Sequence, residues 1–114
     1  IVFDEPTAML DPKGRHQVMD IIHRLHEAGI TVILITHFME EAMQAERLIV
    51  MKDGRITDDT PPRDFFADRE RIQRAGLEMP AIIALREELV RLGLPVDASV
   101  QTEEELIEAI CQLQ

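Results

Sequence analysis

Residues 1–12 read IVFDEPTAMLDP, a short apolar run that stops at two adjacent carboxylates, Asp4 and Glu5. A proline, a threonine and a third carboxylate, Asp11, follow at once. The apolar residues do not alternate with polar ones, which predicts the end of a β-strand buried on both faces. A buried strand that stops at clustered acids is typical of a phosphate-handling site, because one carboxylate can hold Mg²⁺ while the next polarises an attacking water.

A helix and a second apolar strand are predicted next. Asp11 suits the N-cap of a helix from Pro12 to about Ala28, and Gly29 suits a left-handed turn at its end. Residues 30–36 form another apolar run, and strand, helix and strand in this order give a right-handed crossover between parallel neighbours. His37 follows directly, so we expect it at the same sheet edge as the acids, where ligands bind in open α/β sheets.

The segment after His37 predicts a short helix and then a β-hairpin. The helix is expected near residues 39–45, and a strand at residues 47–52. Asp53-Gly54 is a strong two-residue hairpin signal, which returns the chain through residues 55–57.

The chain changes character at residues 58–62, which are polar and carry two prolines. We place a domain boundary there, with a sheet-forming part at residues 1–58 and a helical extension at residues 59–114.

Helices are predicted at residues 63–75 and 80–92, and a last one begins at Thr102, where Glu105 completes a capping box. The last two helices carry apolar stripes at helical spacing, formed by Ile82, Leu85, Leu89 and Leu92 on one and by Leu106, Ile107, Ile110 and Leu113 on the other. We expect these stripes to pack one subunit against another.

Composition narrows the possible partners. The net charge is −10, with −3 in residues 1–57 and −7 in residues 58–114, which argues against nucleic acid because such a partner needs a basic surface. A single cysteine, Cys111, excludes an internal disulfide and suits a reducing compartment. No apolar run approaches the length of a bilayer span.

Two histidines on the first predicted helix could form a metal site. His23 and His26 stand three residues apart, as a pair of metal ligands could. No cysteine or third ligand lies nearby in the sequence, so a solvated helix face is the favoured interpretation of this pair.

The run DEPTAMLDP at residues 4–12, together with ITH at residues 35–37, resembles the Walker B strand, D-loop and switch-histidine segment of ATP-binding-cassette ATPases. This resemblance implies an α/β fold: the C-terminal portion of a P-loop NTPase parallel sheet, with Walker B and switch-histidine strands and a β-hairpin, followed by a small helical extension.

The same resemblance implies ATP and Mg²⁺ as cofactors and assigns roles to four side chains. Asp4 would bind Mg²⁺ through water, and Glu5 would be the catalytic base. His37 would contact the γ-phosphate and help to place the water. Asp11, in the D-loop, would reach the nucleotide across a nucleotide-sandwich dimer. Each role suits its residue, since hard oxygen prefers Mg²⁺, a carboxylate can take a proton from water, and imidazole can bond a phosphate oxygen.

The sequence after the predicted hairpin makes the family resemblance more specific. It reads TPPRDFFAD, then AGLEMP, RLGLP and TEEELIEAI, which is similar to the C-terminal extension of cobalt-importer and energy-coupling-factor ATPases. Asp59 stands where that family often has glycine, and Asp64 where it often has glutamate. The resemblance covers the whole chain.

This similarity implies the ATP-hydrolysing subunit of an importer for a transition metal or a vitamin, located at the cytoplasmic face of the membrane. It implies a second ATPase subunit, a transmembrane coupling subunit and a substrate-binding membrane subunit as partners. The chain contains no Gly-rich phosphate loop, glutamine loop or signature segment. We therefore expect it to be the C-terminal part of such a subunit and to be inactive alone.

Other interpretations remain open at this point. The chain could come from another importer or from a non-transport ATP-binding-cassette ATPase of DNA repair or translation, although the acidic tail disfavours nucleic-acid partners. It could also be a catalytically inert interaction fragment in which only the helical tail matters.

Overall fold

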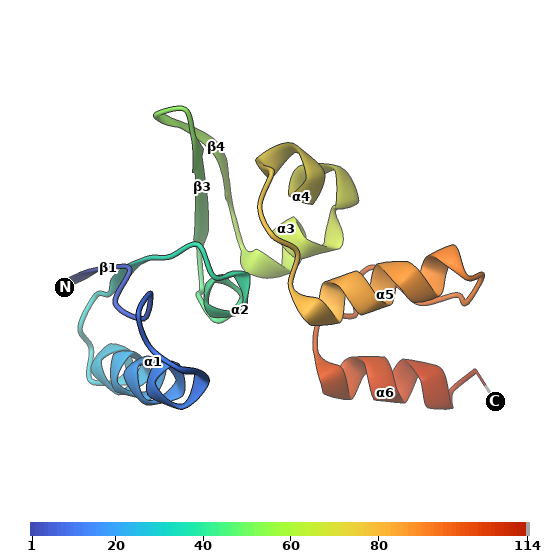
Figure 1. Cartoon of the computed structure of the whole chain (residues 1–114), viewed down its shortest axis with the longest axis horizontal. Coiled ribbons are helices and arrows are strands. Elements are labelled where there is room, and N and C mark those ends of the chain that lie inside the picture. The colour runs from blue at the N-terminus through green and yellow to red at the C-terminus, as the bar shows by residue number, and fades with distance from the viewer. Residues whose placement is uncertain (114) are drawn as a thin grey trace.

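A computed structural model describes residues 1–113 of the chain (Figure 1). The fold is mixed α/β, with one two-stranded parallel sheet, one two-stranded antiparallel sheet and six helices in the described residues. The elements follow in the order β1 (Val2–Asp4), α1 (Pro12–Glu27), β2 (Ile33–Ile35), α2 (Met39–Ala42), β3 (Leu48–Lys52), β4 (Arg55–Thr60), α3 (Pro62–Ala67), α4 (Arg69–Ala75), α5 (Ala81–Arg91) and α6 (Glu103–Cys111).

Strands β1 and β2 pair in parallel, and α1 connects them and lies beneath them in Figure 1. The predicted strand–helix–strand unit is therefore confirmed, although β2 is shorter than the apolar run at residues 30–36. Helix α1 begins and ends as predicted, and Gly29 adopts φ +91°, the left-handed conformation that glycine tolerates best.

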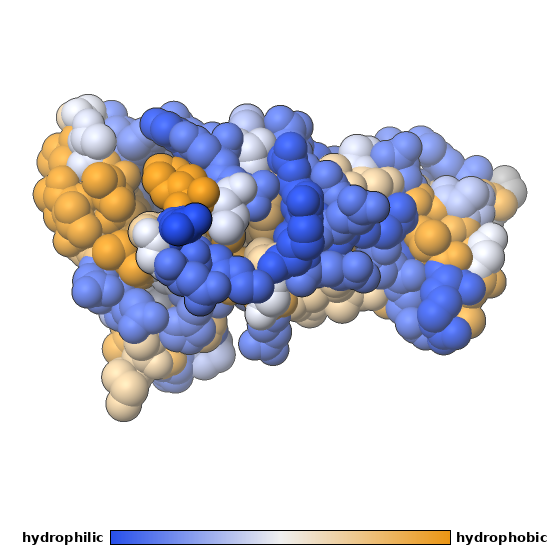
Figure 2. All heavy atoms as spheres, turned by 90° about the horizontal axis from the view of Figure 1, so that it is seen from above, coloured by the Kyte–Doolittle hydropathy of each residue, from blue (hydrophilic) through white to orange (hydrophobic). Residues whose placement is uncertain are grey.

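The prediction that the first strands are buried on both faces is wrong for the described residues. Only the central residues, Phe3 and Leu34, are partly buried, while their neighbours Val2 and Ile33 are exposed. Helix α1 can cover only one face of the pair, and no second layer covers the other face within residues 1–113. Figure 2 shows the resulting hydrophobic surface at the end of the molecule that carries the N-terminus.

The antiparallel hairpin forms at the predicted turn. Asp53 and Gly54 both adopt positive φ, +53° and +75°, as a two-residue hairpin of the favoured twist requires. Strand β4 extends to Thr60, three residues beyond the predicted return at 55–57. Arg47 bonds Asp59 through two nitrogens, at 2.7 and 2.6 Å, and this hydrogen-bonded guanidinium lowers the pKa of the Asp59 carboxyl. The acid at position 59 therefore has a partner at the base of the hairpin.

The main core joins both sides of the predicted boundary at residue 58. It is a cluster of buried apolar side chains from α2, β3, α3, α4 and α5: Met39, Ala42, Val50, Phe65, Phe66, Ile72 and Ile83. Phe65 and Phe66 meet edge to face, with ring centroids 5.1 Å apart. The helical part therefore packs directly on α2 and the hairpin.

A buried arginine organises the helical part. Arg86 on α5 is completely buried and donates to three backbone carbonyls, those of Phe66, Ala98 and Val100, at 2.6–3.0 Å. Its Nε also donates to the Glu87 carboxylate at 2.9 Å. The guanidinium suits this role because its five N–H groups can satisfy several acceptors at once. It ties α5 to the end of α3 and to the loop before α6.

Helix α6 begins at the predicted cap, since Thr102 Oγ1 accepts from the backbone N–H of Glu105 at 3.1 Å. The predicted stripe on this helix is divided between two environments. Leu106 is 3 % exposed and packs in a second core cluster with Val96 and Val100, whereas Ile107 is 56 % exposed. Leu106 therefore belongs to the interior and is unavailable for contacts between subunits.

Among residues 1–113, none of the helices combines the length and the hydrophobicity that a bilayer crossing requires.

The pairing of α6 with α3 predicts a pH-dependent contribution to stability. Two nitrogens of Arg63 lie 3.1 and 3.2 Å from the Glu105 carboxylate and lower its pKa below the ordinary 4.5. A folded-state pKa below the unfolded value stabilises the fold above the unfolded pKa, and this contribution disappears as the pH falls through the folded pKa. We expect Glu105→Gln to lower the melting temperature at pH 7 but not below the folded-state pKa of Glu105. Thermal unfolding followed by circular dichroism across this pH range checks it, with the exposed neighbour Glu104→Gln as control; a pH-independent difference would contradict the ion-pair explanation.

Candidate functional site

The ends of the two parallel strands bring together an acid and an imidazole. The register places Asp4 beside Ile35, and the backbone N–H of Glu5 donates to the Ile35 carbonyl at 2.8 Å, one hydrogen bond beyond the sheet. His37 Nδ1 then lies 2.9 Å from Glu5 Oε1. Both side chains face solvent, with 49 % of Glu5 and 59 % of His37 exposed. The structure thus joins these two residues at one edge, as the sequence predicted.

Glu5 adopts an unusual backbone conformation. Its φ of +47° lies in the left-handed region, which residues with a Cβ rarely occupy. Residues held in such conformations cost about 1–3 kcal/mol and are found preferentially at functional sites. The turn at Glu5 directs the chain away from β1 directly after the paired strand, so the carboxylate projects at the edge beside His37.

Asp4 is the last residue of β1 and is exposed. Within residues 1–113 its carboxylate has no hydrogen-bond or ion-pair partner, so both oxygens are accessible. Carboxylate oxygen is the donor that Mg²⁺ prefers, and one carboxylate with several waters is a common arrangement for this ion. The described residues contain no group of three or more His, Cys, Asp or Glu side chains that could enclose a metal. A single exposed carboxylate is the kind of donor that a largely hydrated Mg²⁺ uses.

Asp11 lies away from this pair. Its Oδ1 accepts from the Gly14 backbone N–H at 2.8 Å and caps α1, as the sequence predicted. A Cβ at Gly14 would lie 2.9 Å from the same oxygen, which explains a glycine in the first turn of the helix. Within the described chain, Asp11 serves as a helix cap and does not contact Glu5 or His37.

Sequence reasoning missed a buried network behind the edge. Glu41 on α2 is 3 % exposed, and its two oxygens accept from the hydroxyls of Thr7 and Thr36 at 2.5 and 2.7 Å. Thr7, itself 1 % exposed, lies in the loop after β1, and Thr36 lies in the loop after β2. The only signal in the sequence was the hydroxyl residue within DEPT, to which the pattern alone gave no partner.

An arginine from α1 reaches the same network. Arg15 Nε lies 3.6 Å from Glu41 Oε1, and its guanidinium carbon stacks 3.8 Å from the centroid of the Phe38 ring. The Phe38 ring in turn lies 4.4 Å from that of His37. The strand-end loops therefore contact both α1 and α2.

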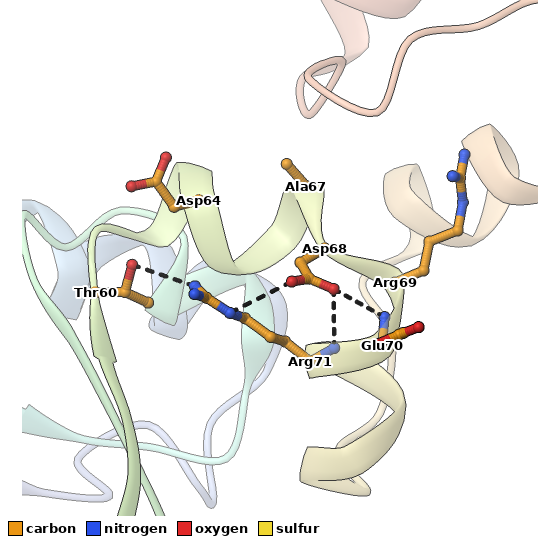
Figure 3. Close-up of a pocket in the computed structure, with 7 residues that line it drawn as sticks. All are labelled: Thr60, Asp64, Ala67, Asp68, Arg69, Glu70 and Arg71. Atoms are coloured by element: carbon orange, nitrogen blue, oxygen red, sulfur yellow. Dashed lines mark hydrogen bonds and ion pairs between the residues drawn. The ribbon is translucent and has the colours of Figure 1, made fainter.

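Two cavities differ in their relation to this edge. A cavity of about 690 Å³ lies over the start of α4 and is lined by Thr60, Asp64, Ala67, Asp68, Arg69, Glu70 and Arg71 (Figure 3). Two of its charged groups bind other residues of the lining: Asp68 caps α4, and Arg71 reaches back toward Asp68 and Thr60. None of the predicted site residues lines it. A second cavity of about 470 Å³ includes His37, Phe38 and Arg15 in its lining, so it adjoins the strand-end edge.

The histidine pair on α1 has protein partners. His23 Nε2 lies 2.8 Å from Gln44 Oε1, and His26 Nε2 lies 2.9 Å from Glu46 Oε1. Both contacts join α1 to the loop after α2 and are exposed. This arrangement agrees with the favoured interpretation of a solvated helix face.

Curated relatives match the chain over most or all of its length. An energy-coupling factor transporter ATP-binding protein, EcfA1, of Clostridium novyi is 44 % identical over 115 residues, covering 100 % of this chain and 41 % of the relative. The EcfA1 of Symbiobacterium thermophilum is 46 % identical over 114 residues, covering 99 % and 40 %. The EcfA1 of Caldanaerobacter subterraneus is 52 % identical over 86 residues, covering 75 % and 31 %. No protein-family model matches the chain.

The chain resembles the C-terminal part of an energy-coupling-factor ATP-binding protein. It spans about 30 to 40 % of the length of these relatives. The agreement extends through the helical tail, so the narrower resemblance predicted from residues 58–114 is confirmed together with the broader one.

In this energy-coupling-factor-like chain, Asp11 can stabilise α1 through its hydrogen bond as a helix cap and through its negative charge. Two substitutions at this position separate these contributions to the free energy of unfolding. We expect Asp11→Ala to lower the free energy of unfolding by about 0.5–2 kcal/mol, because the Gly14 N–H loses its acceptor. Asp11→Asn retains an acceptor oxygen and should change it much less. Denaturant unfolding measures both variants, and equal losses for Ala and Asn would show that the carboxylate charge matters more than the cap.

Proposed function

We propose that the protein carrying this chain is the ATP-hydrolysing subunit of an energy-coupling-factor-type importer for a transition metal or a vitamin. The observation that carries the proposal is the contact of 2.9 Å between Glu5 and His37 at the ends of two parallel strands. A carboxylate and an imidazole in contact can together orient a water and a phosphate oxygen. The names of the matched relatives support the same assignment.

Each predicted site residue has a role in this proposal. Glu5 takes a proton from the attacking water, and its left-handed backbone presents the carboxylate at the edge. His37 contacts the γ-phosphate and helps to place the water. Asp4 would hold Mg²⁺ through water, and the ion, when bound, would supply charge that stabilises the transferring phosphoryl group. Asp11 contributes to the nucleotide site of a partner subunit from its position at the start of α1.

The proposed parent fold is a P-loop NTPase sheet that continues beyond β1 and β2. The exposed apolar side chains of these strands, including Val2 and Ile33, support it, because an open apolar sheet face and an unpaired edge favour burial by further layers and strands. We also retain the division into residues 1–58, which belong to the nucleotide-binding domain, and residues 59–114, a mainly helical extension that begins within β4 and packs on this domain.

The proposed partners are a second ATPase subunit, a transmembrane coupling subunit and a substrate-binding membrane subunit, with the protein at the cytoplasmic face of the membrane. The 114 residues contain no Gly-rich phosphate loop, so we propose that they do not hydrolyse ATP by themselves.

The base role of Glu5 has a direct test in the intact ATPase subunit. Glu5→Gln keeps the size of the side chain but cannot take a proton, so we expect ATP binding to persist while turnover falls by about 100- to 10,000-fold. Glu46→Gln is a matched control, since Glu46 is exposed and pairs with His26 on α1. Steady-state hydrolysis and equilibrium nucleotide binding measure the two effects. Turnover at the native rate in Glu5→Gln would remove Glu5 as the base.

We further propose that the helical extension contributes to pairing between ATPase subunits. Several apolar side chains of this part are exposed, among them Leu85 on α5, Leu92 directly after α5, and Ile107 and Ile110 on α6. Exposed apolar groups on neighbouring helices are typical of contact surfaces between proteins.

Substitutions at Ile107 and Leu106 distinguish an effect on the pairing of subunits from an effect on folding. We expect Ile107→Glu to weaken dimer formation of the intact subunit with little change in melting temperature, because Ile107 is exposed. Leu106→Glu should lower the melting temperature itself, because it places a charge in the second core cluster. Met51→Glu, at another exposed apolar position on the hairpin, is the control. Sedimentation velocity measures association, and an unchanged dimer in Ile107→Glu would count against this surface.

A further inference from the structure

We infer that Glu41 is a positioning residue that sets the distance between Glu5 and His37 by fixing both strand-end loops to one buried carboxylate. This inference rests on the proposed ATPase function and assigns it a residue that contacts neither the nucleotide nor the attacking water.

The contacts of Glu41 lie close to both site residues along the chain. Thr7, which donates to Oε1 at 2.5 Å, is two residues after Glu5. Thr36, which donates to Oε2 at 2.7 Å, directly precedes His37. Thr36 Oγ1 also accepts from the Phe38 backbone N–H at 3.0 Å, so the residues on both sides of His37 are held.

The contact between Glu5 and His37 cannot hold this geometry by itself. Both side chains are about half exposed, and an exposed pair competes with water and is screened by salt. The Glu41 carboxylate is buried, its bond to Thr7 is buried and its bond to Thr36 is partly buried. Hydrogen bonds to a charged group are stronger where water is excluded. The buried side of the two loops therefore determines where the exposed side chains can meet.

The chemistry of the acceptor is specific. An ionised carboxylate accepts at both oxygens and can serve two hydroxyl donors at once. Glutamine offers only one acceptor oxygen, so one of the two threonines must lose its acceptor or reverse its hydroxyl. Arg15 Nε lies 3.6 Å from Oε1 and places a positively charged group beside this carboxylate. The described residues leave no buried side-chain nitrogen or oxygen without a partner, so the network is complete.

The neighbouring acid provides a matched control. Glu40 precedes Glu41 on α2, but its side chain is exposed and has no hydrogen-bond or ion-pair partner in residues 1–113. Glu40→Gln therefore makes the same chemical change on the same helix without touching the two loops.

The test uses the intact ATPase subunit with Glu41→Gln, Thr7→Val, Thr7→Ser and Glu40→Gln. We expect Glu41→Gln and Thr7→Val to lower kcat for ATP hydrolysis by about 10- to 100-fold with KM for ATP unchanged, as expected for a small misplacement of reacting groups. Thr7→Ser restores the hydroxyl and should restore kcat, and Glu40→Gln should match the native protein. The ¹⁵N resonance of His37 Nδ1, which reports the bond to Glu5, should move in the first two variants only.

Two results would overturn the inference about Glu41, and a third would overturn the proposed function instead. Native kcat and an unchanged His37 resonance in Glu41→Gln and Thr7→Val would overturn the inference. A loss of melting temperature that Thr7→Ser does not restore, with KM and kcat both altered, would reduce Glu41 to a structural role and also overturn it. If the native subunit hydrolyses no ATP, the proposed function fails, and the His37 resonance alone still decides whether Glu41 positions the pair.

Discussion

The parallel register of β1 with β2 is the constraint on which the site depends. It aligns Asp4 with Ile35 and continues through one more hydrogen bond, from the Glu5 N–H to the Ile35 carbonyl at 2.8 Å. Because side chains alternate along a strand, a slip by one residue would turn the end of β1 to the opposite face and carry Glu5 away from His37. Only three residues of each strand are paired, so the register also needs support from outside the sheet.

Magnitudes indicate where that support lies. An exposed ion pair contributes about 0–1 kcal/mol, which does not offset the roughly 1–3 kcal/mol of a non-glycine residue held at positive φ, as Glu5 is. Hydrogen bonds to a charged group contribute about 1.5–3 kcal/mol each, and the Glu41 carboxylate accepts two, one buried and one partly buried. The hydrogen bonds of Glu41 therefore contribute enough free energy to hold the strained turn at Glu5. The exposed contact between Glu5 and His37 does not.

The sequence predicted best what a few neighbouring residues determine. The caps at Asp11 and Thr102 and the Asp53-Gly54 turn depend on local chemistry, and the structure has all three. Glu41 was out of reach, because its bond to Thr7 joins residues 34 apart and an acid in a short helix normally indicates a solvated surface. Apolar patterns likewise indicate which side chains favour burial but not what covers them. For that reason the sequence could not predict that Leu106 lies in the interior or that one face of β1 and β2 is uncovered, and only the structure shows both.

Helix α2 connects this site with the helical part of the chain. Four residues are far too few for an isolated helix to persist in water, so α2 exists only because its surroundings hold it. On one side, Met39 and Ala42 are packed in the main core with the phenylalanines of α3 and with Ile83 of α5. On the other side, Glu41 bonds the two strand-end loops. The segments after residue 58 thus support the helix that carries Glu41, and the geometry at the strand ends depends on residues that contain none of its chemistry.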